Sequence, residues 1–334
     1  MPKSAIADNF KFWLTQQQPH NLSRLLGTDV SGIIKTTEDF EPALSVDMMQ
    51  ALLEIPLSGN PCADLSLSYD SKNFRTNYFT SEIGSKILPL FRYFSMLLPD
   101  NNLMFIEMDT SKHNEIPAVF LDCIDHADLI FERLWQKGAE PPQWNYAWNL
   151  TKNLPPPWKL LYIGFLPNRQ EMPLKLIFAK LNEEGDYLPN TQEDIEILLK
   201  HLHHPPLSED AKEKLDFLFS SQYNRITVSV DLLANNEFGP ILGMEVFLPE
   251  NLDNPQDMLN TEQGKTLLNQ LQKWRLADNR VQSLSPYCGI FFPPQKAQCM
   301  ESQIQVFLNH IKLRWQDGKP LPIKAYLAVN SYFR

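Results

Sequence analysis

Cysteine is scarce in this chain of 334 residues, and none of its four cysteines forms a C-x-x-C pair with another. Disulfide frameworks and zinc sites need tighter spacing, so we expect buried, reduced thiols. Long apolar runs are also missing, since no stretch approaches the ~18 residues that cross a bilayer. The first residues, 1–18, lack the apolar core of a signal peptide. We therefore expect a cytoplasmic protein with no membrane partner.

Positive charge is in deficit. Lysine and arginine total 30 against 40 aspartate and glutamate residues, a net charge of −10. Phosphate backbones are bound by basic surfaces, so this balance argues against a nucleic-acid partner. The sequence contains no glycine-rich phosphate loop, no nucleophile elbow and no H-E-x-x-H motif. We expect no metal site built from side chains alone.

Glycine is rare as well, with 12 residues against 26 prolines. The prolines gather between segments that have regular patterns, where they punctuate the chain. No low-complexity stretch or convincing linker divides the sequence. We expect a single domain over residues 1–334.

What the chain does have is strict alternation of polar and apolar residues in segments of strand length. In 323–332, Lys324 and Tyr326 share one face of the strand, and the other face is apolar. The segments 64–70 and 225–232 alternate in the same way. This pattern predicts strands with one polar and one apolar face.

Most of these strands come in pairs that are separated by one or two helical stretches. The predicted strands are 64–70, 103–108, 118–123, 158–165, 174–180, 225–232, 242–248, 287–292 and 323–332. The predicted helices are 9–26, 46–54, 81–96, 125–136, 191–201, 208–220, 261–274 and 300–315, with Thr191 and Ser208 as N-caps. Hairpins make neighbouring strands antiparallel, which argues against a doubly wound sheet and a TIM barrel.

About ten strands are enough to close a barrel around a cavity. Helices outside such a barrel need an apolar outer face, so the charged face must point inward. A dry interior would make unpaired charges cost several kcal/mol each, and a solvated lumen avoids this. The expected fold is α+β: an antiparallel barrel of about ten strands with a polar lumen, built from repeated αββα units and wrapped by outer helices. The alternative is an open sheet with helices on one face and water on the other.

Three local features accompany this architecture. A predicted hairpin carries Lys175 in its second strand, the closing strand contains Lys324-Ala325-Tyr326, and Asp64 begins an early strand. Together they resemble the prenyltransferase barrel, or ABBA fold, of aromatic and cyanobactin-type peptide prenyltransferases. Those enzymes use lysine-centred hairpins and Lys-x-Tyr strands to hold a diphosphate. The cyanobactin-type enzymes carry a proton-accepting glutamate on an early strand, where this chain has the shorter acid.

The resemblance implies a transferase that moves an isoprenyl group from an allylic diphosphate to an aromatic or heteroatom nucleophile. The acceptor would be a small aromatic molecule or a peptide side chain, and Mg²⁺ would accompany the diphosphate. Catalytic carboxylates would be Asp64 and Glu107. The side chains that bind the donor would be Lys159, Lys175, Arg225, Lys324, Tyr326 and Tyr332.

Two other interpretations remain open. The basic residues can instead pair with Asp231, Glu245 and Glu107 on neighbouring strands, in a non-enzymatic accessory protein whose barrel binds a small molecule or peptide. A hydrolase that uses Asp64 and Glu107 as paired acids is a third candidate. A net positive lumen with an aromatic collar favours the transferase, and a net negative lumen favours the binding protein.

Overall fold

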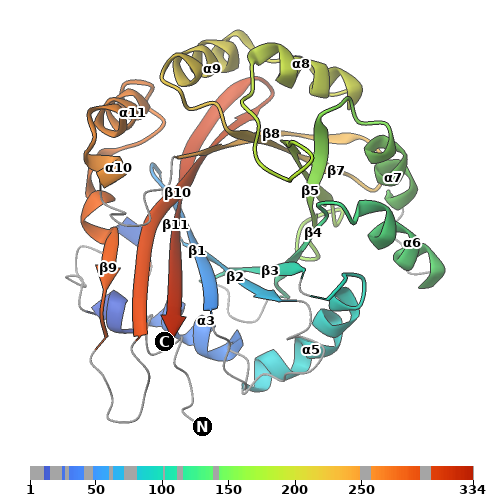
Figure 1. The fold of residues 1–334 in the computed structure, drawn as a ribbon, viewed down its shortest axis with the longest axis horizontal. Helices are drawn as coiled ribbons and strands as arrows, with labels where there is room; N and C mark the ends of the chain where they lie inside the picture. Colours follow the sequence, from blue (N-terminus) through green and yellow to red (C-terminus); the bar gives the residue numbers. More distant parts are fainter. Residues whose placement is uncertain are drawn as a thin grey trace.

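A closed barrel of ten antiparallel strands, with helices around its outside, forms the described part of the computed structural model (Figure 1). The described residues are 11–15, 25–26, 30–40, 48–59, 63–70, 81–100, 102–110, 116–137, 143–248, 257–293 and 302–333. The predicted fold class is confirmed, and the open sheet is wrong. Closure itself comes from β10 and β11, which pair with each other while β11 also pairs with β1.

Neighbours around the barrel follow the chain from β1 to β8, and then come β10 and β11. The short strand β9 pairs only with the outer part of β10. The strands are β1 Met48–Pro56, β2 Asp64–Asp70, β3 Leu103–Asp109, β4 Ala118–Asp122, β5 Trp158–Phe165, β6 Leu174–Lys180, β7 Ile226–Leu232, β8 Phe238–Phe247, β9 Gly289–Phe291, β10 Ser302–Gln316 and β11 Lys319–Phe333.

The helices surround the barrel in chain order (Figure 1). They are α3 Val30–Phe40, α5 Glu82–Ser95, α6 Ala127–Lys137, α7 Trp144–Lys152, α8 Gln192–His201, α9 Glu209–Ser220, α10 Asp257–Asn260 and α11 Glu262–Lys273, with 3-10 turns at Asn279–Ser283 and Ser285–Tyr287. The predicted N-caps are confirmed, since Thr191 and Ser208 each accept a backbone N–H of the first helical turn. The helix predicted over 9–26 lies largely outside the described residues. Within the described ranges, no helix has both the length and the apolar character needed to cross a bilayer.

Two segments predicted as helices are strands. The first, 46–54, is strand from residue 48 on, where the described residues begin, and this strand is β1, which pairs on both sides with β2 and β11. A short apolar segment fits a helix and a strand equally well by its spacing, and the pairing decides between them.

The second wrong helix, 300–315, is the long strand β10 over its described residues, 302–315. A bulge between Leu308 and His310 shifts the register of this strand by one residue. Its apolar residues that pack in the outer core are therefore even-numbered before the bulge, as at Val306, and odd-numbered after it, as at Leu313. That change of parity imitates helical spacing. The turn after β10 is Asp317-Gly318, and both residues have the positive φ that a two-residue type I′ hairpin requires.

The outer face of the barrel is apolar, as predicted, and packs against the helices. Its buried side chains include Leu65, Leu67, Ile226, Val228, Val230, Ala325 and Leu327. They form one continuous core with buried helix residues such as Leu198 and Leu215. A one-residue slip in register would move these side chains into the lumen, so this core specifies the pairing.

A second, smaller apolar cluster lies apart from that core. It includes Phe120 and Ile177, with Phe105 and Tyr162 packed against it. Phe105 pairs with Phe120 across β3 and β4, and the register continues to Gly164 and then to Lys175. Directly opposite residues share a face, so this cluster lines the lumen. The lumen is therefore polar with one aromatic wall, not polar throughout.

Truncation of the outer face should destabilise the barrel. Ile226→Ala removes a fully buried side chain, so we expect the free energy of unfolding to fall by about 2–5 kcal/mol. Ile197→Ala is the matched control, because Ile197 on α8 is 45% exposed and its loss should change stability by less than about 0.5 kcal/mol. Urea unfolding measures both. Equal effects of the two substitutions would contradict this assignment of the core.

Candidate active site

One end of the barrel is here called the mouth. At this end β1 finishes, β2 begins, and a turn joins β5 to β6. The part of the lumen here called the mouth half extends from the mouth inward to Glu245, which accepts a hydrogen bond from Thr227 near the start of β7. It holds nine described charged side chains that influence one another electrostatically. They are the five carboxyl groups of Glu54, Asp64, Glu107, Asp231 and Glu245 and the four cationic groups of Arg169, Lys175, Lys312 and Lys324.

Strand register brings these groups together. Lys175 on β6 lies directly opposite Asp231 on β7. Lys312 on β10 lies opposite both Glu245 on β8 and Lys324 on β11. Charges from strands far apart in the sequence thus form one band around the inside of the barrel.

Each of these lysines is paired with a carboxylate. Lys175 Nζ donates to Asp231 Oδ1 at 2.5 Å, and Lys312 Nζ donates to Glu245 Oε1 at 2.7 Å. Glu245 also accepts a hydrogen bond from the Thr227 hydroxyl at 2.9 Å. Burial opposes ionisation of Glu245, but the nearby charge of Lys312 outweighs it and lowers the pKa of Glu245 to about 2.

The third pair closes the seam between β1 and β11. Lys324 Nζ and the Tyr326 hydroxyl both donate to the carboxylate of Glu54. Burial opposes ionisation here too, but the charge of Lys324 and these two hydrogen bonds lower the pKa of Glu54 to about 2. Glu54 is therefore an ionised, fully enclosed carboxylate.

Two carboxyl groups have no lysine of their own. Asp64 on β2 lies opposite Glu54 and hydrogen-bonds to it, and burial together with the charges of Glu54 and Glu107 raises the pKa of Asp64 to about 8. Burial and the charge of Glu54 also raise the pKa of Glu107. Among the described residues, Glu107 makes no hydrogen bond or ion pair. Burial and the nearby negative charge therefore favour the protonated state of both carboxyl groups.

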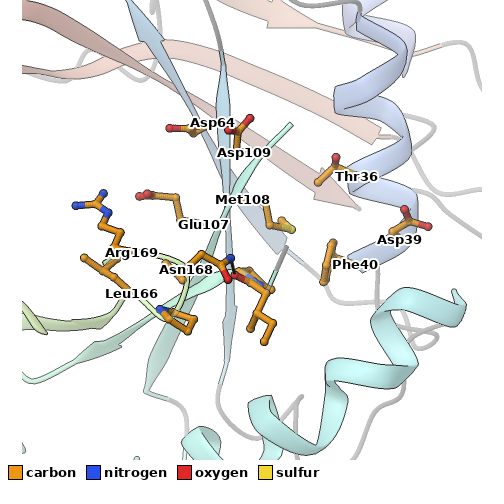
Figure 2. Close-up of a pocket in the computed structure, with 14 residues that line it drawn as sticks. Thr36, Asp39, Phe40, Asp64, Glu107, Met108, Asp109, Leu166, Asn168 and Arg169 are labelled. Atoms are coloured by element: carbon orange, nitrogen blue, oxygen red, sulfur yellow. Dashed lines mark hydrogen bonds between the residues drawn. The ribbon is translucent and has the colours of Figure 1, made fainter. Parts of the chain in front are cut away.

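Both groups face a cavity of about 220 Å³ at the mouth (Figure 2). Its lining comes from the end of α3, from β2 and β3, and from the β5–β6 turn. Figure 2 shows the side chains of Asp64, Glu107 and Arg169 converging on the same space. Arg169 also donates to Asp231 at 3.4 Å, so it links the cavity to the lysine-bearing strands.

The cations lie close enough to repel one another. Burial lowers the pKa of Lys175, and the charges of Lys312 and Arg169 add to this effect against the opposing influence of Asp231. Four cations in one space of low dielectric repel one another strongly unless anions lie beside them. In the described structure, carboxylates supply those anions.

Aromatic rings line the lumen beside the charges. The rings of His310 and Tyr326 stack with centroids 4.0 Å apart, and Phe247 lies 5.1 Å from His310. Phe105 and Tyr162 meet edge to face at 5.3 Å on the opposite wall. These rings form an aromatic collar of the kind expected for a transferase. Five carboxyl groups stand against four cations in the mouth half, and the raised pKa values of Asp64 and Glu107 reduce the negative charge that the carboxyl groups contribute.

Three predicted donor-binding residues do not join the mouth half. Lys159 is on β5 at the other end of the barrel and pairs with Asp125 at 2.9 Å. Arg225 is exposed, just before β7 begins at that same end. Tyr332 on β11 pairs in register with Met48, also at that end, and its side chain lies outside what the structure describes. Lys175, Lys324, Tyr326, Asp64 and Glu107 do come together.

Sequence reasoning missed four residues of the mouth half. Glu54 and Lys312 were hidden in the two segments predicted as helices, and so was His310. Asp317-Gly318, a strong hairpin signal before the closing strand, could have revealed β10. Arg169 lies in a turn, where alternation gives no information about direction.

The described structure is an antiparallel barrel that is closed by ten strands, is wrapped by helices and has a charged lumen. This is the architecture of the prenyltransferase barrel. No protein-family model and no curated protein sequence matches the chain.

Solved structures of this fold do match. The apo form of the prenyltransferase PriB gives a TM-score of 0.54 at 11% sequence identity over 98% of this chain and 96% of that one. NotF in complex with brevianamide F and DMSPP gives 0.54 at 10% identity over 97% and 94%. The 6-dimethylallyltryptophan synthase of Micromonospora olivasterospora, in complex with DMASPP and Trp, gives 0.53 at 9% identity over 95% and 96%. At these identities the chain shares the prenyltransferase-barrel fold with them.

The carboxyl groups of the lumen should titrate far apart. We expect Asp64 to titrate near pH 8 and Glu245 to stay ionised down to about pH 2. Because the folded-state pKa of Asp64 lies above its unfolded-state value, its contribution to stability is full at low pH and is lost as pH rises toward 8. Carbon-13 NMR of labelled carboxyl groups measures both, with Asp64→Asn and Glu245→Gln assigning the signals. An Asp64 midpoint below pH 5 would contradict the arrangement.

Removing the charge of Glu54 should destabilise the seam. Glu54→Gln leaves Lys324 without its carboxylate, and breaking a buried pair in this way costs about 3–5 kcal/mol. The double variant Glu54→Gln/Lys324→Met should recover part of that loss, because no unpaired charge remains. Chemical denaturation compares the two variants with the wild type. A single variant as stable as the wild type would show that the seam does not depend on this pair.

Proposed function

We propose that the chain is a transferase that moves an isoprenyl group from an allylic diphosphate to a nucleophile bound at the mouth of the barrel. The observation that carries the proposal is the convergence of Lys175, Lys312, Lys324 and Arg169 in the mouth half. Ammonium and guanidinium groups bind phosphate oxygens strongly in a site of low dielectric. Support comes from NotF and the Micromonospora synthase, which share this fold and were solved with DMSPP and DMASPP.

Binding of the donor requires the lysines to exchange partners. In the described structure Asp231, Glu245 and Glu54 hold them, and a diphosphate would take over some of those contacts. The two carboxylates with pKa near 2, Glu54 and Glu245, stay ionised at neutral pH, so the donor competes with charges and not with neutral acids. We therefore expect weaker donor binding than a lumen of free lysines would give.

The reaction breaks the bond between C1 of the isoprenyl group and the diphosphate oxygen, and the electron pair leaves with the diphosphate. The allylic cation that forms is stabilised by the faces of aromatic rings, a role that Tyr326, Phe105 and Tyr162 can fill. The nucleophile of the acceptor then bonds to C1 and loses a proton. Asp64 and Glu107 face the cavity and are the carboxyl groups available to take it.

Mg²⁺ belongs to this scheme only as a companion of the donor's diphosphate. Within the described ranges, no three His, Cys, Asp or Glu side chains are grouped as metal ligands. Three of the lumen carboxylates are already held by lysines. The residues present therefore do not form a resident Mg²⁺ site, and no step depends on one.

A second candidate is a binding protein on the same barrel. The observation in its favour is that every lysine of the mouth half already has a carboxylate partner, so the lumen is electrostatically complete without a diphosphate. Such a protein would bind a small molecule or peptide at the mouth and release no diphosphate.

Donor assays separate the two candidates. The full chain is incubated with dimethylallyl or geranyl diphosphate, Mg²⁺ and candidate aromatic and peptide acceptors, and release of diphosphate is measured. We expect release, with Lys175→Ala and Lys324→Ala each weakening donor binding by about tenfold or more, because each removes a charge-assisted contact. Lys265→Ala is the control, since Lys265 is an exposed lysine on the outer helix α11.

Failure would be clear. If no prenyl diphosphate binds, or if the lumen variants bind it as well as Lys265→Ala does, the transferase proposal is wrong. Donor binding without release for any acceptor would favour the binding protein.

A further inference from the structure

The cavity at the mouth is small and has an acidic wall. Its volume of about 220 Å³ is below the ~300–1,000 Å³ of sites for drug-sized ligands, so it suits a single side chain or a small group. Four carboxyl groups line it against the single cation Arg169. These are Asp39, Asp64, Glu107 and Asp109. Asp39 pairs with Lys35 at 2.9 Å, and Arg169 is shared with Asp231.

Two hydrogen-bond acceptors of the lumen have no partner among the described residues. Glu107 is largely enclosed by the barrel and has no hydrogen-bond or ion-pair partner among the described residues. Deeper in the lumen, Nε2 of His310 has none either, although the residue is only 5% exposed. Nδ1 of that ring lies 2.7 Å from Asn309 Oδ1, an acceptor, so Nδ1 carries the proton and Nε2 offers a lone pair.

The cations of the lumen are committed elsewhere. Lys175, Lys312 and Lys324 are each bound to a carboxylate of another strand, on β7, β8 and β1 respectively, and none is bound to a carboxylate of β2 or β3. The lumen is thus divided, with lysines on β6, β10 and β11 and, on β2 and β3, the carboxyl groups of Asp64 and Glu107, which have no lysine partner among the described residues. A buried acceptor without a donor costs free energy, and a ligand rich in N–H donors removes that cost.

The rim of the cavity adds an apolar requirement. Phe40, Met108 and Leu166 line it, and so does Ile116, which is 43% exposed. A ligand that fits has a cationic, donor-rich head for the acidic wall and an apolar stem for the rim. A guanidinium or primary ammonium on an alkyl stem has both.

We propose that the mouth cavity binds the acceptor as an organic cation, a guanidinium or primary ammonium group such as that of an arginine or lysine side chain, with Glu107 as its ion-pair partner. This inference rests on the proposed function and names its acceptor class. The charge of the bound cation favours the ionised form of Glu107, and this carboxylate takes one proton from the cation's nitrogen, which leaves a lone pair there. That lone pair would bond to C1 of the isoprenyl group while the bond from C1 to the diphosphate oxygen breaks and its electron pair leaves with the diphosphate. The alkylated nitrogen group then carries the positive charge.

The test uses two probes that differ in charge and little else. N-acetyl-arginine amide carries a guanidinium, and N-acetyl-citrulline amide carries the neutral urea of the same shape. Calorimetry on the full chain should show the arginine probe binding at least about tenfold more tightly, the difference expected for one enclosed charge pair. Glu107→Gln should remove that preference. Glu184→Gln should keep it, because Glu184 is exposed at the opposite end of the barrel.

Equal affinity for the two probes, binding of neither, or a preference that survives Glu107→Gln overturns the inference. Circular dichroism checks that the variant folds. If the variant does not fold, the test uses the carboxyl carbon-13 signal of Glu107 in the wild type instead. That signal must shift when the arginine probe is added and must not shift when the citrulline probe is added. Neither probe contains a diphosphate, so the outcome is independent of the donor assay. Donor binding without a preference for the arginine probe overturns this inference and not the proposed transferase. A preference for the arginine probe without donor binding overturns the transferase, and the bound cation is then a ligand and not an acceptor.

Discussion

Pairing of lysine with carboxylate across neighbouring strands is the interaction on which this barrel depends. Each of three pairs spans one strand boundary: Lys175–Asp231 joins β6 to β7, Lys312–Glu245 joins β10 to β8, and Lys324–Glu54 joins β11 to β1. A slip of one residue at any boundary would send a lysine into the apolar layer beneath the helices and leave its carboxylate buried and alone. Register and charge balance therefore specify each other. The hydrophobic outer face selects the same registers independently. Agreement between charge pairing and hydrophobic packing favours a single fold.

Alternation was enough to predict the fold because most strands keep one parity from end to end. β2, β6 and β7 were predicted to within a residue, and so was β5 in spite of a bulge between Leu160 and Tyr162. The direction of each face followed from the need to keep charge out of the helix layer. β10 was not predicted as a strand because its bulge reverses the parity halfway along it. β1 was not predicted as a strand because the spacing of a short apolar segment fits a helix and a strand equally well. Site residues were predicted where their strands were predicted. Lys175 and Asp64 were found, while Glu54 and Lys312, partners that decide the charge of the lumen, were not. Pairing across strands is long-range information that one segment's pattern does not contain.

The same pairs that stabilise the barrel restrict what it can bind. An anion in the mouth half must replace Asp231, Glu245 or Glu54 at a lysine, and the displaced carboxylate then needs a new partner in a space of low dielectric. Positive charge brought in with the anion supplies that partner. A barrel of this composition therefore favours binding an anion and a cation together, and each should bind more tightly when the other is present, since the coupling between two sites is reciprocal.

That coupling gives the raised pKa of Asp64 a place in the chemistry. Burial, together with the negative charge of Glu54 and Glu107, raises the pKa of Asp64 to about 8. A cation at Glu107 would relieve the crowding and lower the pKa of Asp64, so the group would release its proton and become an acceptor only when the cavity is filled. A diphosphate at Lys324 would act in the opposite direction, since it weakens the charge that now offsets Glu54. The protonation state of one carboxyl group thus reports which side of the lumen is occupied, and a base pKa near the working pH is the value that proton transfer favours.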